Sequence, residues 1–123
     1  MIAATALCVI LAALAVFQLA LALGAPIGHF AWGGRHRVLP TKLRVGSAVS
    51  ILVYAVIAVL ALDRSGVVEV LPDAVSTVGM WIVFAYFVIG IPLNVISRSK
   101  PERYTMTPIV TILAVLSLLV SLG

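Results

Sequence analysis

The residues best suited to bind a ligand gather in one segment, residues 24–44, whose sequence is G-A-P-I-G-H-F-A-W-G-G-R-H-R-V-L-P-T-K-L-R. It holds four of the eight Lys and Arg residues, both histidines and one of the two tryptophans. Guanidinium groups bind phosphate and carboxylate oxygens through paired hydrogen bonds, and the free N–H groups at the start of a helix favour the same anions. The segment therefore predicts a site for an anionic group, with Arg35, Arg37 and Arg44 as the main candidates beside His36 and Lys42. Alternatively, these charges only set the topology and make nonspecific contacts with lipid headgroups.

A second basic interval, residues 98–103, could join that site if it lies at the same end of the protein. Its first residue, Arg98, is also the last of four residues spaced four apart, after Tyr86, Gly90 and Asn94. Residues four apart share one face of a helix, so this face leads from an aromatic ring to a cation. Gln18, in the first apolar run, adds an uncharged polar group at a comparable distance from the basic intervals.

Two interpretations of these polar side chains remain open. They could hydrogen-bond between helices, as Ser, Thr, Asn and Gln do inside membranes. Alternatively, they could line a cavity beneath residues 24–44, with His29 and Trp32 beside the basic side chains. The ligand-binding residues predicted by the second interpretation are Gln18, His29, Trp32, Arg35, Arg37, Arg44, Tyr86, Asn94 and Arg98.

The composition places these residues in a membrane protein. Of 123 residues, 63% are hydrophobic and 10% charged, whereas soluble domains average about 45–50% apolar and about 25% charged residues. The net charge of +4 is confined to short intervals, which argues against a nucleic-acid-binding face and indicates the bilayer and its anionic lipids as partners. Cys8 is the sole cysteine, so an intramolecular disulfide is excluded. We expect no metal or other cofactor, because His29 and His36 lack a defined ligand set.

Four apolar runs are long enough to cross a bilayer, which takes about 20 helical residues. They predict an all-α protein, a four-helix transmembrane bundle running up-down-up-down, as one domain over residues 1–123. The predicted helices cover residues 2–23, 42–63, 75–97 and 101–122. Thr41 is expected to cap the second helix, and Ser99 with Glu102 is expected to form a capping box at the start of the fourth.

The distribution of Lys and Arg predicts the orientation. Basic residues dominate the first and third connections, whereas the middle connection has Arg64 among three acidic residues. The positive-inside rule then places residues 24–44 and 98–103 in the cytoplasm and both termini outside. We expect a multi-pass protein of the cell inner (cytoplasmic) membrane.

Three stretches, G-A-P-I-G-H-F-A-W-G-G at 24–34, L-P-T-K-L-R at 39–44 and N-V-I-S-R-S-K-P-E-R at 94–103, resemble those of small four-helix bacterial integral membrane proteins of uncharacterised function. The resemblance implies a plain inner-membrane protein and carries over no activity.

The sequence contains no motif that identifies a reaction. We expect a small non-enzymatic accessory or interaction subunit, either a homo-oligomer or the partner of a larger membrane protein. The alternative is a binding or transport module for an amphiphile or lipid with an anionic headgroup, held by the basic first loop. A third hypothesis, an enzyme acting on a lipid phosphate with His29 as general acid or base, finds no carboxylate near the site except Glu102.

Overall fold

The structure is a computed structural model that describes residues 2–97 and 99–123. Over this part of the chain it is all-helical, which confirms the predicted fold class. Its α-helices are α1 (Ile2–Ala22), α2 (Thr41–Arg64), α3 (Asp73–Val95) and α4 (Lys100–Leu122). Two short 3-10 turns, η1 (Gly28–Phe30) and η2 (Trp32–Gly34), lie between α1 and α2. The observed helix ends differ from the predicted ranges by no more than two residues.

Each α-helix is long and apolar enough to cross a bilayer. The helices contain 21, 24, 23 and 23 residues, and about 20 residues at 1.5 Å each span a hydrocarbon core of about 30 Å. Their outward faces carry large apolar side chains, including Val16, Leu52 and Leu93. Such a surface is stable in lipid and not in water, so the chain is a multi-pass membrane protein.

The helix starts agree only in part with the expected capping. Thr41 is the first residue of α2, and the N-cap position belongs to Pro40, which has no side-chain cap. The prediction that Thr41 caps this helix is therefore wrong. Ser99 does cap α4, because its Oγ accepts a hydrogen bond from the N–H of Glu102 at 3.5 Å. Glu102 does not complete a capping box, since its carboxylate accepts from the N–H of Gly33 instead.

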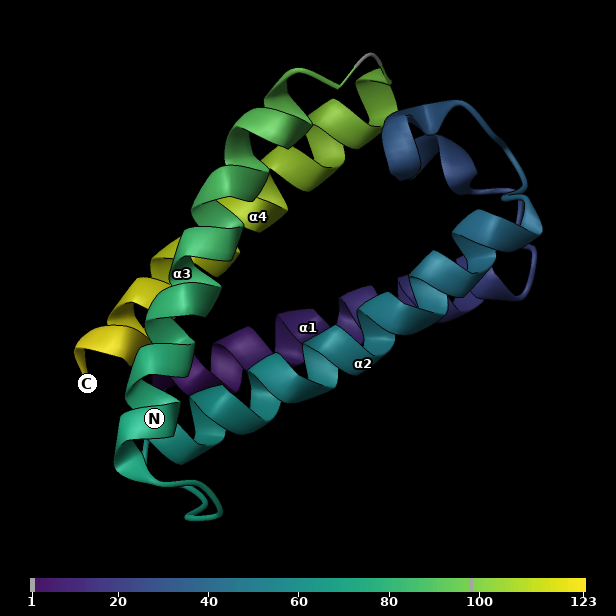
Figure 1. Cartoon of the computed structure of the whole chain (residues 1–123). Helices are drawn as coiled ribbons and strands as arrows, with labels where there is room; N and C mark the ends of the chain where they lie inside the picture. The colour runs from purple at the N-terminus through teal and green to yellow at the C-terminus, as the bar shows by residue number, and fades with distance from the viewer. Residues whose placement is uncertain (1, 98) are drawn as a thin grey trace.

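The helices form two antiparallel hairpins, α1–α2 and α3–α4, that diverge from one end of the molecule (Figure 1). Both hairpins meet at the end that carries the termini and the connection between α2 and α3. The core cluster of buried apolar residues gathers mainly there, because most of its members come from the start of α1 and α3 and from the end of α2 and α4. They include Ala4, Leu7, Ala61, Met80 and Val120. Arg64 also closes this end, donating from Nη2 to the carbonyl oxygen of Ser121 at 3.1 Å.

At the opposite end the connection between α1 and α2 reaches from one hairpin to the other (Figure 1). We call this connection, residues 23–40, the roof loop. Its contact with α4 is close, because the hydroxyl of Ser99 donates to the carbonyl oxygen of His29. Gly34, with φ +73°, lies directly against the Ser99 side chain, where a β-carbon would overlap it. Glycine is thus required at this position by both backbone conformation and space.

Candidate functional site

A cavity of about 370 Å³ lies beneath the roof loop, between the two hairpins. All four α-helices and the roof loop contribute side chains to its wall. The lining residues are Leu14, Phe17, Gln18, Phe30, Ala31, Trp32, Ser50, Tyr54, Tyr86, Phe87, Ile89, Gly90, Leu93, Asn94, Glu102, Met106, Ile109, Val110 and Leu113. Tyr86 and Ile89 are 54% and 61% exposed, so this wall of the cavity is not sealed from the surroundings.

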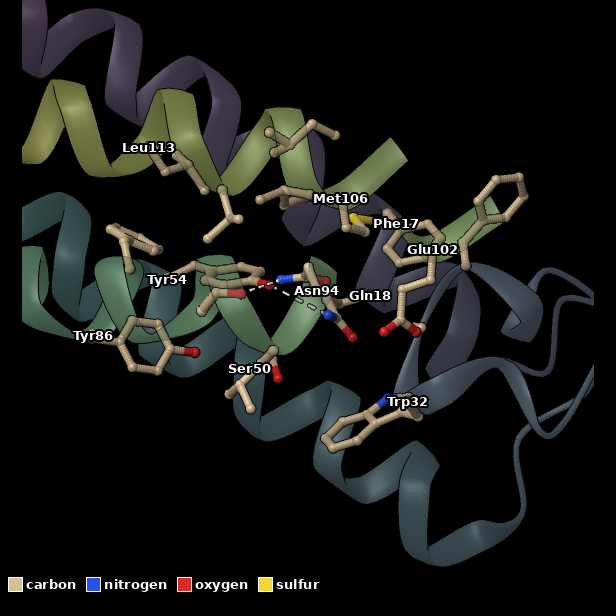
Figure 2. Close-up of a pocket in the computed structure, with 18 of the residues that line it drawn as sticks. Phe17, Gln18, Trp32, Ser50, Tyr54, Tyr86, Asn94, Glu102, Met106 and Leu113 are labelled. Atoms are coloured by element: carbon tan, nitrogen blue, oxygen red, sulfur yellow. Dashed lines mark hydrogen bonds between the residues drawn. The ribbon is translucent and has the colours of Figure 1, made fainter. Parts of the chain in front are cut away.

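The cavity is apolar along the helices and polar beneath the roof loop. Phe87 and Leu113 form part of its apolar wall, whereas Gln18, Asn94 and Glu102 lie toward the roof loop (Figure 2). This arrangement follows from the chain, since the middle of each span is apolar and the polar residues lie near the helix ends. The cavity therefore has the two environments that an amphiphilic molecule requires.

Gln18 on α1 is a buried polar side chain of the cavity wall with an incomplete set of partners. Its Nε2 donates to the hydroxyl oxygen of Tyr54 on α2 at 3.3 Å. Its Oε1 is buried and has no hydrogen-bond partner within residues 2–97 and 99–123, and the residue is only 9% exposed. A buried amide oxygen without a donor costs about 1–3 kcal/mol, so this atom is available to a ligand that brings a donor.

Glu102, in the first turn of α4, brings a carboxylate to the same cavity. The residue is 8% exposed, and its Oε2 accepts a hydrogen bond from the backbone N–H of Gly33 at 2.9 Å. Among the described residues, no Lys, Arg or His side chain pairs with it. The N-terminus of a helix favours negative charge, yet a buried carboxylate still lacks the compensation that a cation would provide.

Trp32 is held rigidly at the roof of the cavity. Its φ of 52° is in the left-handed region, which is uncommon for a bulky residue and costs about 1–3 kcal/mol. Its Nε1 donates to the hydroxyl of Ser47 on α2 at 3.1 Å. The indole also lies close over Gly46, where a β-carbon would come within 3.0 Å of the ring. These contacts offset the backbone strain and fix the ring beside the cavity.

The two interpretations of the polar side chains can now be compared bond by bond. Gln18 and Tyr54 form one interhelical hydrogen bond. In contrast, the hydroxyl of Ser50 donates to Gly46 O at 3.0 Å and Nδ2 of Asn94 donates to Gly90 O at 2.8 Å, each within its own helix. Ser50 and Asn94 therefore do not join helices, whereas Gln18 and Tyr54 do, and all four side chains line the cavity.

The predicted site residues fall into two groups. Gln18, Trp32, Tyr86 and Asn94 line the cavity together. The other described residues of the predicted set do not line it; they are His29, Arg35, Arg37 and Arg44. Arg98 lies outside the described residues.

The basic side chains that do not reach the cavity have other surroundings. Arg35 and Arg37 are exposed residues of the roof loop. Arg44 turns back to α1, where its Nε donates to the carbonyl oxygen of Ala22 at 2.9 Å. His29 packs its ring against Phe30, with 4.3 Å between the ring centroids. These side chains lie outside the cavity wall, and the anionic site predicted at Arg35, Arg37 and Arg44 stays a prediction.

Glu102 is the functional candidate that the sequence interpretation assigned to a different role. The spacing Ser99-Lys100-Pro101-Glu102 matches a capping box, and this pattern assigns the Glu102 carboxylate to the helix start. A carboxylate that faces the cavity was therefore not predicted. One signal could have indicated it, because Glu102 is the only acidic residue outside residues 63–73. An isolated carboxylate among basic residues at one end of a membrane bundle is a candidate for function.

The chain matches no protein-family model, no curated protein and no solved structure. The resemblance to small four-helix bacterial membrane proteins stays a prediction, and the candidate site rests on its geometry.

Proposed function

We propose that the protein binds an amphiphilic molecule in the bilayer, with the apolar tail between the two hairpins and the headgroup beneath the roof loop. The observation that carries this proposal is the cavity itself, apolar between the helices and polar at the roof loop. Small-molecule sites have volumes of about 300–1,000 Å³, mostly apolar walls and a few polar groups that orient the ligand. The volume of about 370 Å³ is in this range.

The incomplete hydrogen bonding at the polar end supports the same proposal. A protein that needs polar residues only to hold its helices together would pair them with one another. Here the Oε1 atom of Gln18 has no partner, and Glu102 has no cationic partner among the described residues. A headgroup that fills this end would satisfy both groups.

The identity of the membrane and the orientation of the protein in it are also part of this proposal. We place the protein in the inner (cytoplasmic) membrane with the roof loop on the cytoplasmic side, because Lys and Arg concentrate in residues 24–44 and 98–103. The exposed Arg35 and Arg37 would then contact anionic lipid headgroups on the outer side of the roof loop, each contributing about 1 kcal/mol.

The earlier expectation of a non-enzymatic accessory subunit also stays a prediction. Both hypotheses share the absence of catalysis, and they differ in whether the cavity holds a ligand. An enzyme with His29 as general acid or base is less well supported, because the His29 side chain is not part of the cavity wall.

Native mass spectrometry on protein extracted in a mild detergent, followed by identification of the released small molecules, tests the proposal. Ser50→Phe adds a ring to the cavity wall, and Ala48→Phe adds the same ring to the exposed face of the same helix. We expect one amphiphile per chain in the wild type and in Ala48→Phe, and its loss in Ser50→Phe. Wild-type protein that is bare, or that carries only a second protein, would instead favour the accessory role.

A further inference from the structure

From the chemistry of the polar end we infer that the headgroup is a protonated amine, so that the preferred ligand is a cationic amphiphile. This inference rests on the proposed function and specifies its ligand. It replaces the anionic headgroup that the basic residues of the sequence suggested.

The charge of the cavity wall is the first support. Among the described residues, no Lys, Arg or His belongs to the wall, and Glu102 is the only carboxylate in it. This carboxylate lies in the first turn of α4, at the helix end that attracts anions, and it accepts a hydrogen bond from the N–H of Gly33. A charge that is only 8% exposed needs a counter-charge, and an ammonium group in the cavity would provide it.

The second support is the arrangement of hydrogen-bond acceptors. Figure 2 shows the amide of Gln18 and the carboxylate of Glu102 turned toward the same part of the cavity. Oε1 of Gln18 has no donor, and one carboxylate oxygen of Glu102 is not used by Gly33. An ammonium group carries up to three N–H donors and no acceptor, so it can bond to both side chains. A phosphate or carboxylate headgroup would bring only further acceptors.

The third support is the aromatic content near this end. Phe17, Trp32 and Tyr54 belong to the wall together with Gln18 and Glu102. The faces of aromatic rings attract cations, and this attraction increases when the cation leaves water. Arg35 and Arg37 oppose a cation only weakly, because both are exposed and their charges are screened by salt.

A purely structural role for Glu102 makes a different prediction from a ligand-binding role. As a structural residue, it needs only an acceptor for the N–H of Gly33, and the side-chain oxygen of Gln can serve as that acceptor. Glu102→Gln therefore preserves the attachment of the roof loop while removing the charge. Glu69→Gln is the matched control, because Glu69 is an exposed carboxylate in the connection between α2 and α3.

The test is isothermal titration calorimetry on the protein in lipid nanodiscs, with empty nanodiscs as the reference for partitioning. Three probes share one tail: n-decylammonium, n-decanol and n-decyl phosphate. We expect n-decylammonium to bind wild type with a Kd at least about tenfold lower than n-decanol, and n-decyl phosphate to bind least. Glu102→Gln should weaken n-decylammonium about tenfold or more and leave n-decanol unchanged, a tenfold change being about 1.4 kcal/mol. Glu69→Gln should change neither.

The outcomes separate the two proposals. Equal Kd values for the three probes in the wild type, or a preference for n-decyl phosphate, would overturn the amine headgroup and leave the amphiphile cavity in place. The same holds if Glu102→Gln binds n-decylammonium as well as wild type does. If none of the probes binds saturably, the proposed function itself fails. The ranking in the wild type needs no variant, so it decides the question even if Glu102→Gln does not fold.

Discussion

The backbone N–H of Gly33 donates to Oε2 of Glu102 at 2.9 Å, joining residues 69 positions apart in the chain. This bond attaches the roof loop, which belongs to the first hairpin, to the first turn of α4 in the second hairpin. Together with the hydrogen bond from Ser99 to His29, it holds the roof over the diverging ends of the helices. The same carboxylate lines the cavity. Glu102 therefore attaches the roof loop and, in the proposed function, also binds the headgroup.

Closure of the roof should depend on Gly34 more than on Gly33. Both have positive φ, 73° and 78°, so Ala at either position costs about 1–2 kcal/mol in backbone strain. Only at Gly34 would the new β-carbon also overlap Ser99, whereas nothing lies within 4 Å at Gly33. Hydrogen–deuterium exchange of the roof-loop amides should therefore increase clearly more in Gly34→Ala than in Gly33→Ala. Equal increases would contradict the observed contact with α4.

The bond between Trp32 and Ser47 should be visible by fluorescence. With Trp81→Phe as background, Trp32 is the only tryptophan. Ser47→Ala removes the partner of its Nε1, a loss of about 1 kcal/mol, and iodide should then quench Trp32 more strongly. Ser50→Ala is the control, because that hydroxyl bonds to Gly46 O within its own helix. Identical quenching in both variants would show that Ser47 does not hold the ring.

Substitution of the exposed arginines should leave binding almost unchanged, whereas substitution of a cavity residue should weaken it. We expect Arg35→Ala combined with Arg37→Ala to leave the Kd of n-decylammonium within about twofold, because neither residue lines the cavity. Gln18→Leu should raise that Kd about fivefold or more, because it removes a buried acceptor worth about 1 kcal/mol. Calorimetry in nanodiscs measures both. A strong loss of binding in the arginine variant would contradict this prediction and would place the binding site at Arg35 and Arg37.

The proposed orientation can be measured by cysteine labelling in intact cells. On a Cys8→Ser background, His36→Cys and Glu69→Cys place single thiols at exposed positions at opposite ends of the bundle. An impermeant maleimide added outside should label Glu69→Cys, whereas His36→Cys should react only after the membrane is opened. The reverse pattern would invert the protein and place the cavity mouth on the other side of the membrane.

The sequence predicted the helices because each depends on a local signal. Long apolar runs define α1 to α4, and Gly24 with φ 97° ends the first of them as its position before Pro26 suggests. The polar face of Asn94 and Tyr86 was also predictable from four-residue spacing. The directions of Glu102 and Arg44 were not, because they depend on how the roof loop packs between two diverging hairpins. That divergence is a property of tertiary packing, and helical periodicity contains no information on it.

The most direct measurement of the central claim is photo-crosslinking with n-decanol that carries a diazirine at the end of its chain. Its uncharged headgroup separates the existence of the site from the chemistry of the headgroup. The proposed site predicts that labelled residues come from the cavity wall, in particular Tyr86, Met106 and Leu113. Excess n-decanol and the Ser50→Phe substitution should both suppress this label, and Ala48→Phe should not. Label spread over the outward faces of the helices, insensitive to competitor and to Ser50→Phe, would contradict an amphiphile site between the hairpins.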